Sequence, residues 1–255
     1  MTAAADSADD RLLAAIECHD VAALRAAMAG RAAGALVRGK TVLQWLLEMY
    51  MRSERFAACL RVLLDRGASL PDAALRSVLL DDADGLRAAL AADPVALHRR
   101  VDLVSAFTPL RGASLLHVAA EYGNLAAARV LVDAGADVGA RAAIDAHGGD
   151  GQTPLFHTVS SLLDHGAPVM HLLLAAGART DVTLPQLTWG RGFEWETTLF
   201  DVTPISFCQA GLLPQVHRRE ADVYRNLASL LAAAARPLPP LPNVPNRYLQ
   251  PRSRS

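Results

Sequence analysis

Residues 112–140 contain two short apolar helices in succession, each bounded by residues that start or stop a helix. Ser114 is placed to cap the first helix, whose apolar positions recur at helical spacing up to Gly123. The second helix is predicted over Asn124–Ala134, with one apolar face, and Gly135 ends it. A pair of this size cannot bury its apolar face alone, so it predicts neighbours of the same kind.

The same order of signals recurs on both sides of this block. Thr41, Thr153 and Thr203 each open a copy, and Thr41 and Thr153 are predicted to cap its first helix. Thr153 and Thr203 precede a proline at the first helical position, where a missing N–H costs little. Two more helix pairs, over 12–28 and 73–92, lack that motif. We therefore predict six units after a disordered stretch 1–9; the whole array covers 10–236, and its units are 10–39, 40–70, 71–111, 112–150, 151–201 and 202–236.

The stretch Gly112–Ala140 resembles one full ankyrin repeat, and the other units resemble it more weakly. The resemblance implies an all-α fold, a right-handed ankyrin-type α-solenoid of about six helix-turn-helix repeats with long hairpin or loop fingers between them. It also implies a non-catalytic module that binds a protein partner through its concave groove and fingers. His117 stands at the histidine of the family's Thr-Pro-Leu-His motif, where the ring is expected to bond to backbone and join successive repeats.

Three connections between units, over 93–111, 135–153 and 177–203, exceed the roughly 12 residues that a repeat of about 33 leaves for a connection. Enlarged fingers commonly lie on a binding face, and aromatic residues with arginine are typical of interface hot spots. We predict five protein-contacting residues, which are Arg141, Trp189, Arg191, Phe193 and Trp195. The alternative is that the stretch 189–195 folds as a small hairpin whose rings pack on the neighbouring repeat.

Gly34–Thr41 matches the phosphate-loop pattern G-x-x-x-x-G-K-T, which in a nucleotide-binding protein cradles phosphates with backbone N–H groups. That chemistry requires a buried strand before the loop, whereas residues 22–33 are alanine-rich and helical in pattern. Thr41 is already accounted for as a helix cap. Nucleotide binding through Gly34–Thr41 remains one alternative function, and a regulatory subunit of an unidentified enzyme is another.

No catalytic residue, cofactor or metal is predicted. His157, His165 and His171 lie near one another in the sequence, but no cysteine or carboxylate has the spacing that supports a metal site. For His157 we favour a buried ring whose hydrogen bonds are satisfied by backbone. The three cysteines are far apart and form no disulfide framework.

The composition indicates a bacterial, cytoplasmic protein that binds neither nucleic acid nor membrane. Its net charge is −1, no apolar run is long enough to span a bilayer, and arginine replaces lysine almost throughout. We expect a monomer.

Residues 237–255 are rich in proline and are predicted to form a strap against the last repeat. Alternatively, Arg236, Pro239 and Pro242 have the spacing of polyproline ligands.

Overall fold

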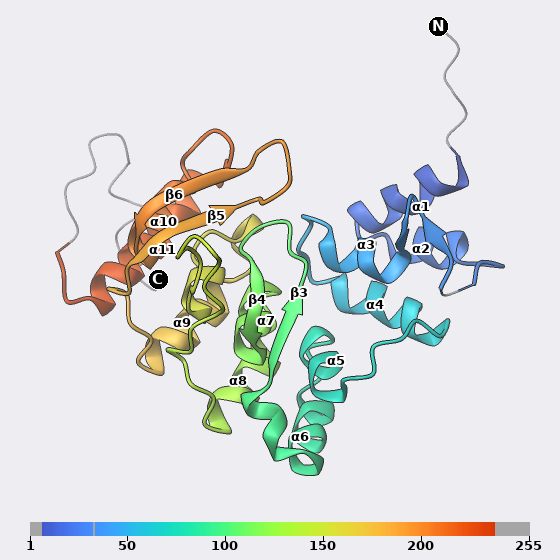
Figure 1. Cartoon of the computed structure of the whole chain (residues 1–255), viewed down its shortest axis with the longest axis horizontal. Helices are drawn as coiled ribbons and strands as arrows, with labels where there is room; N and C mark the ends of the chain where they lie inside the picture. The colour runs from blue at the N-terminus through green and yellow to red at the C-terminus, as the bar shows by residue number, and fades with distance from the viewer. Residues whose placement is uncertain (1–6, 33, 238–255) are drawn as a thin grey trace, which may run out of the picture.

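The computed structural model describes residues 7–32 and 34–237, which form six successive helical pairs (Figure 1). The pairs are α1 (Ala8–Glu17) with α2 (Val21–Ala27), α3 (Val42–Glu48) with α4 (Phe56–Asp65), α5 (Ala73–Leu79) with α6 (Ala83–Ala92), α7 (Leu115–Glu121) with α8 (Leu125–Asp133), the 3₁₀ helix η2 (Pro154–His157) with α9 (Ala167–Ala175), and α10 (Pro204–Ala210) with α11 (Glu220–Ala233). Two further 3₁₀ turns, η1 (Pro94–His98) and η3 (Leu162–Asp164), lie in the connections.

Threonine caps and glycine stops set the ends of several helices, as the sequence predicts. Thr41 Oγ1 and Thr203 Oγ1 each accept the N–H of the residue three positions on, at 3.1 and 3.2 Å. Gly123 and Gly135 have φ of +66° and +88°, the left-handed region that glycine enters without steric cost. These local signals fix where a helix begins and ends before any packing is considered.

The fifth pair departs from the pattern. The prediction that the Thr153 side chain caps an α-helix is wrong, because residues 154–157 form a 3₁₀ turn. The Phe156 N–H donates to the Thr153 carbonyl at 3.0 Å, so it is not free to bond to the hydroxyl. Further on, Leu163 and Asp164 have φ of +52° and +61°, which prevents a helix from continuing there.

Three antiparallel hairpins correct the expectation of an all-α fold. They pair β1 (Leu36–Val37) with β2 (Lys40–Thr41), β3 (Arg100–Leu103) with β4 (Leu110–Ser114), and β5 (Leu184–Trp189) with β6 (Thr197–Val202). The last two occupy long connections that the sequence assigned to fingers. The stretch 189–195 does contain a hairpin turn, since Trp189 pairs with Thr197.

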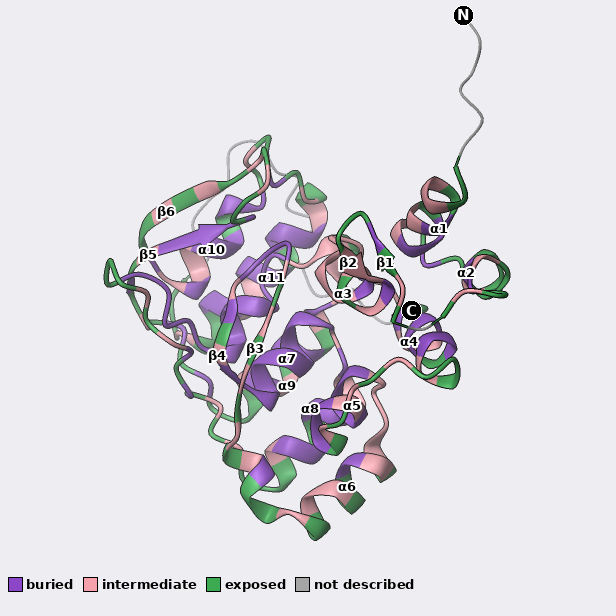
Figure 2. Ribbon diagram, turned by 45° about the vertical axis from the view of Figure 1, so that its right-hand side comes forward, coloured by how far each residue is buried: buried purple, intermediate pink, exposed green. Residues whose placement is uncertain are grey.

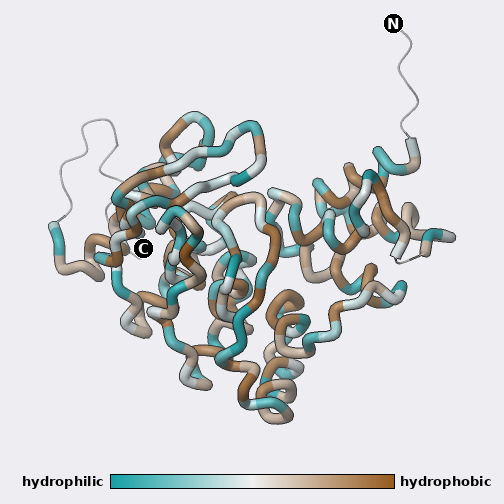
Figure 3. The backbone as a smooth tube through the Cα atoms, in the orientation of Figure 1, coloured by the Kyte–Doolittle hydropathy of each residue, from teal (hydrophilic) through white to brown (hydrophobic). Residues whose placement is uncertain are grey.

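One apolar core runs through all six pairs. Figure 3 shows hydrophobic positions recurring along every pair, and Figure 2 shows the buried residues concentrated where helices face each other. Ala119, Ala127 and Ala128 are fully buried between α7 and α8 and their neighbours. Side chains this small let helix backbones approach closely, which explains why an alanine-rich chain with few aromatic rings packs as stacked hairpins.

Hydrogen bonds join each pair to the next. His117 Nδ1 accepts the Ser114 N–H at 3.1 Å, so the opposite nitrogen carries the proton and donates to the Gln152 carbonyl at 3.0 Å. The expected role of His117, bonding to backbone across two units, is confirmed. Asn124 Nδ2 similarly donates to the Val78 carbonyl at 2.7 Å, joining the third and fourth pairs.

The ends of the chain differ in part from expectation. Residues 8 and 9 belong to α1, whose first turn is capped by Ser7, so the prediction of disorder is wrong for these residues, and residues 1–6 lie outside the described part of the chain. The Ser7 hydroxyl accepts the Asp10 N–H at 3.1 Å. The predicted strap over 237–255 lies outside the described residues, apart from residue 237. In the part of the chain that the structure describes, no helix has the length and hydrophobicity to cross a membrane.

Replacing Gly123 with alanine is expected to destabilise the protein more than replacing Gly135. Both glycines have positive φ, but a Cβ at Gly123 would lie 2.5 Å from His165 Cδ2, whereas a Cβ at Gly135 meets nothing within 4 Å. We expect a loss of about 1 kcal/mol for G135A from backbone strain and about 3 kcal/mol for G123A from strain and overlap together. Urea unfolding measures both, and equal losses would contradict the packing argument.

Acid is expected to weaken the fold through two buried histidines. Burial lowers the pKa of His19 to about 4 and that of His117 to about 3, from an ordinary value of 6.5. The unfolded chain therefore takes up protons first, so each ring removes about 1.4 kcal/mol of stability per pH unit below 6.5, down to its folded pKa. Urea midpoints between pH 7 and 4 test this, and H117Q should show a shallower decline than the parent protein; an equal slope would contradict the assignment.

Candidate interaction surface

Backbone hydrogen bonds join the long connections into one sheet-like layer. The Ala143 N–H donates to the Arg111 carbonyl at 2.9 Å, which links the β3–β4 hairpin to the next connection. The Asp150 N–H donates to the Gln186 carbonyl at 3.0 Å, which links that connection to the β5–β6 hairpin. We call residues 100–114, 141–152 and 184–202 the finger layer. Figure 1 shows the β5–β6 hairpin lying across one end of the array, with its turn directed toward α3.

A buried charged cluster lies beneath the finger layer. Arg52, before α4, and Glu121, at the end of α7, are only 2% and 4% exposed, and their side chains form an ion pair at 3.6 Å. Glu121 also accepts the His157 Nδ1–H at 2.9 Å and the Ser105 hydroxyl at 2.9 Å. One carboxylate therefore holds together side chains from the second and fifth pairs and from a finger.

Aromatic rings enclose this cluster. The rings of Phe107 and Trp189 are stacked, with centroids 5.5 Å apart and planes 12° from parallel. The Arg52 guanidinium lies 4.5 Å from the Tyr122 ring centroid and 5.8 Å from that of Phe107, and Arg218 lies 5.1 Å from Phe107. Burial lowers the pKa of Arg218 to about 10, with the Glu121 charge acting in the opposite direction. Cation–π contacts of this kind partly compensate the guanidinium groups for lost hydration.

The cluster resembles a catalytic arrangement only in its residue types. Glu121 orients His157, and Ser160 Oγ lies on the same small cavity, as in an acid–base–nucleophile triad. The volume open to the centre of a water molecule is about 10 Å³, which is room for about one water and for no substrate. In the described structure, His157 Nε2 and Ser160 Oγ have no hydrogen-bond partner. The prediction that backbone satisfies His157 is wrong, because a carboxylate holds its ring instead.

The five predicted contact residues lie in different environments. Trp189 is 3% exposed and stacked inside the protein, so its ring is not presented to a partner. Phe193 and Trp195 are half-buried and stack on each other, with ring centroids 4.6 Å apart. Arg141 is exposed, and its Nε donates to the Gly151 carbonyl. Arg191, 40% exposed, forms ion pairs at 3.3 Å with two aspartates, Asp145 and Asp150.

The turn of the β5–β6 hairpin reaches the second helical pair. The Trp195 ring lies edge-on to that of Tyr50, with centroids 6.2 Å apart. Together with the buried Trp189, this contact shows that the hairpin packs on the array at both ends of the stretch 189–195. The hairpin alternative for residues 189–195 therefore describes the structure better than a freely presented loop.

The phosphate-loop interpretation of Gly34–Thr41 is contradicted by the local structure. Leu36 pairs with Thr41 in an antiparallel hairpin, so the residues form a tight turn and no parallel strand leads into a loop. The Lys40 ammonium lies 2.6 Å from a Glu48 carboxylate oxygen and 4.8 Å from the Trp45 ring centroid. A lysine paired with a carboxylate of the helix that follows it is not placed to bind a nucleotide phosphate.

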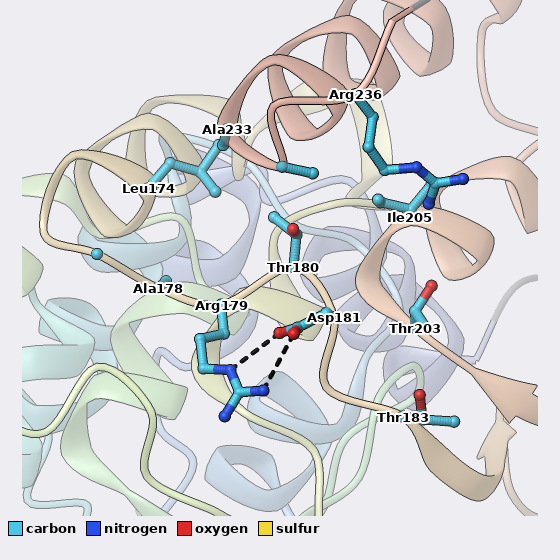
Figure 4. Close-up of a pocket in the computed structure, with 12 residues that line it drawn as sticks. Leu174, Ala178, Arg179, Thr180, Asp181, Thr183, Thr203, Ile205, Ala233 and Arg236 are labelled. Carbon is cyan, nitrogen blue, oxygen red and sulfur yellow. Dashed lines mark hydrogen bonds and ion pairs between the residues drawn. The ribbon is translucent and has the colours of Figure 1, made fainter. Parts of the chain in front are cut away.

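Two other candidate ligand sites are a groove on the surface and the group of histidines at positions 157, 165 and 171. A groove of about 700 Å³ lies between the fifth and sixth pairs (Figure 4), lined by apolar and threonine side chains, by Arg236, and by Arg179 and Asp181, which are bonded to each other at 2.9 and 3.0 Å. Within residues 7–32 and 34–237, no group of three or more His, Cys, Asp or Glu side chains is arranged to hold a metal ion. His165 instead packs against Gly123.

Comparison with known proteins supports the interpretation of the central unit as similar to an ankyrin repeat. Residues 111–143 match the family model described as ankyrin repeat. The fourth helical pair is thus similar to an ankyrin repeat. Among solved structures, the human ASB11 ankyrin repeat domain is similar with 15% identity and a TM-score of 0.37, over 87% of this chain and 82% of that one. No curated protein matches the chain.

The similarity of α7 and α8 to an ankyrin repeat agrees with the signals that the sequence carries there. Ser114 and His117 stand before and within α7, and Gly123 and Gly135 end the two helices. The remaining pairs also place two helical segments in succession, with weaker sequence signals and with a 3₁₀ turn in place of the first α-helix in the fifth pair. Sequence reasoning missed the burial of Arg52, Glu121 and Arg218, because Arg52 and Arg218 lie in polar stretches between helices and Glu121 lies at a helix end, where charged side chains are usually exposed.

Removing the charge of Glu121 is expected to cost much more stability than removing that of Glu48. E121Q would leave the buried Arg52 guanidinium without its counter-ion, at a cost of about 3–5 kcal/mol. E48Q breaks an ion pair with Lys40 that is partly exposed, at a cost of up to about 1 kcal/mol. Urea unfolding at pH 7 compares the two, and a loss below 1 kcal/mol for E121Q would contradict the buried-pair interpretation.

Proposed function

We propose that this protein is a non-catalytic binding module whose finger layer contacts a protein partner. Ankyrin repeats generally mediate protein–protein interaction, and the match over residues 111–143 supports that class. The observation that carries the proposal is the finger layer itself. Backbone hydrogen bonds fix three long connections in one surface, and rigid presentation lowers the entropy cost of binding.

The outer surface of the finger layer, more than the groove, is suited to contact a partner. Phe107, Trp189 and Glu121 fill the inner side and are buried. The outer side exposes Ile144 and Phe200, which are 61% and 69% exposed. Large exposed apolar side chains on a rigid support are typical of binding surfaces.

Four of the residues expected from the sequence belong to this proposal, which are Arg141, Arg191, Phe193 and Trp195. Arg141 presents charge from the second finger, and the stacked pair Phe193 and Trp195 presents aromatic surface at the hairpin turn. Arg191 is held by two carboxylates and so is fixed in position.

We propose that the protein acts as a monomer with one such surface, without a cofactor and without nucleic acid or membrane as partner. A bacterial origin and a cytoplasmic location are part of the same proposal.

A photo-reactive phenylalanine analogue placed at position 193 is expected to cross-link to a protein partner in cells that express the chain. The same analogue at Val95, an exposed residue of η1 outside the finger layer, is the matched control and should give no such product. Mass spectrometry identifies the adduct, and R141E should reduce its yield by roughly tenfold, because it removes a proposed contact residue and the Arg141–Gly151 bond that holds the second finger. Equal cross-linking from both positions would contradict a finger-layer interface.

A further inference from the structure

Strand β6 forms the outer edge of the finger layer. Its partner β5 lies between β6 and the rest of the layer, because the Gln186 carbonyl accepts a bond from Asp150 while Gln186 is paired with Phe200 on the other side. Figures 1 and 2 both show β6 outside β5, and Figure 2 shows β5 mainly buried and β6 largely exposed.

The hydrogen bonds of β5 determine which groups of β6 point outward. In a strand, the N–H and C=O of one residue point to the same side, and the side alternates along the chain. The Gln186 carbonyl and the Thr188 N–H both bond to Asp150, so the backbone groups of these two residues point away from β6. Their register partners, Phe200 and Thr198, must therefore point their own backbone groups away from β5.

These outward backbone groups are available for pairing. Among the described residues, none forms a hydrogen bond to the backbone of Thr198 or Phe200 on that side. The side chains support the same geometry, since the Thr188 and Thr198 hydroxyls lie 3.0 Å apart, as expected for a pair without backbone bonds between them. Two residues thus offer four free backbone hydrogen-bonding groups beside an exposed Phe200 ring.

The charges beside this edge are negative. Glu194 and Glu196 lie at its beginning and Asp201 at its end, and all three are exposed. The nearby cation, Arg191, is already paired with Asp145 and Asp150. Two copies of this chain joined edge to edge would bring like charges together, whereas a basic segment would meet opposite charge at both ends of the edge.

We propose that β6 binds an extended, basic segment of a partner protein as an additional strand. The segment would exchange backbone hydrogen bonds with Thr198 and Phe200, place an apolar side chain against the Phe200 ring, and direct lysine or arginine side chains toward the flanking carboxylates. This inference rests on the proposed function as a protein-binding module and names the chemistry of its partner.

The free edge of β6 is short, so only a short segment can pair with it. Asp201 has φ of +51°, a left-handed conformation that interrupts the extended strand, and Pro185 on β5 interrupts the ladder at the same level. The pairing surface therefore ends after Phe200. A segment of about three to five residues is sufficient to use all the free groups, so the sequence demands on the partner are modest.

Proline at position 198 tests the backbone contribution directly. The Thr198 N–H points away from β5, so T198P removes an outward donor without removing a bond of the β5–β6 ladder. T198V keeps the donor and changes the side chain. The matched proline control is A8P, at the first position of α1, where proline is accommodated. Circular dichroism verifies that all three variants are folded.

The probe is a synthetic nine-residue peptide that alternates lysine and valine, with binding followed by fluorescence anisotropy. T198P is expected to bind it about tenfold more weakly than the parent protein, and T198V and A8P within roughly twofold of it. A glutamate–valine peptide of equal length should bind at least about tenfold more weakly than the lysine peptide. Equal binding to the parent and T198P, or equal binding of both peptides, would overturn the proposal.

Two further outcomes separate this inference from the proposed function. Sedimentation showing a dimer that T198P abolishes would assign the edge to a second copy and overturn the basic-segment proposal. If T198P retains the partner cross-linked through position 193, the edge proposal fails while the finger-layer function stands. If T198P loses the lysine peptide but position 193 forms no cross-link, the edge stands and the proposed contact set fails.

Discussion

The ion pair between Arg52 and Glu121 fixes how the helical pairs are placed relative to one another. A charge that is withdrawn from water must keep a partner, since an uncompensated buried charge costs several kcal/mol. Glu121 satisfies this requirement with Arg52 from the second pair and with His157 from the fifth. Because its carboxylate contacts both at once, neither unit can rotate away from α7 without exposing or unpairing the cluster.

This constraint makes the array less modular than a stack of independent units. In a repeat protein each unit ordinarily contacts its neighbours only. Here the Tyr122 hydroxyl donates to the Leu47 carbonyl at 2.9 Å, and Trp195 in the last finger contacts Tyr50, so residues far apart in the chain meet beside α7. These internal contacts fill the space between α3, α7 and the last finger. They agree with the proposal that a partner contacts the outside of the finger layer and its edge.

The sequence predicts the helical pairs well and the surface poorly, for a physical reason. Caps and stops such as Thr41 and Gly123 act within one turn of helix, so their effect is visible in a short stretch of sequence. Glu121, by contrast, reads as a polar residue at a helix end, and its burial follows only from the approach of Arg52. The phosphate-loop pattern misleads for the same reason, because the match of residue types does not show that Leu36 pairs with Thr41 in a hairpin or that Lys40 is paired with Glu48.

The edge of β6 shows how a free strand is kept from uncontrolled pairing. Long, flat, uncharged edges template aggregation, and proteins protect them by shortening, twisting or charging the strand. Asp201 shortens this edge through its left-handed backbone, and the carboxylates at both ends repel an identical edge on another copy. The same carboxylates that repel an identical edge would attract an extended segment with positive charge. Protection against aggregation and selection of a partner are therefore two consequences of one charge pattern.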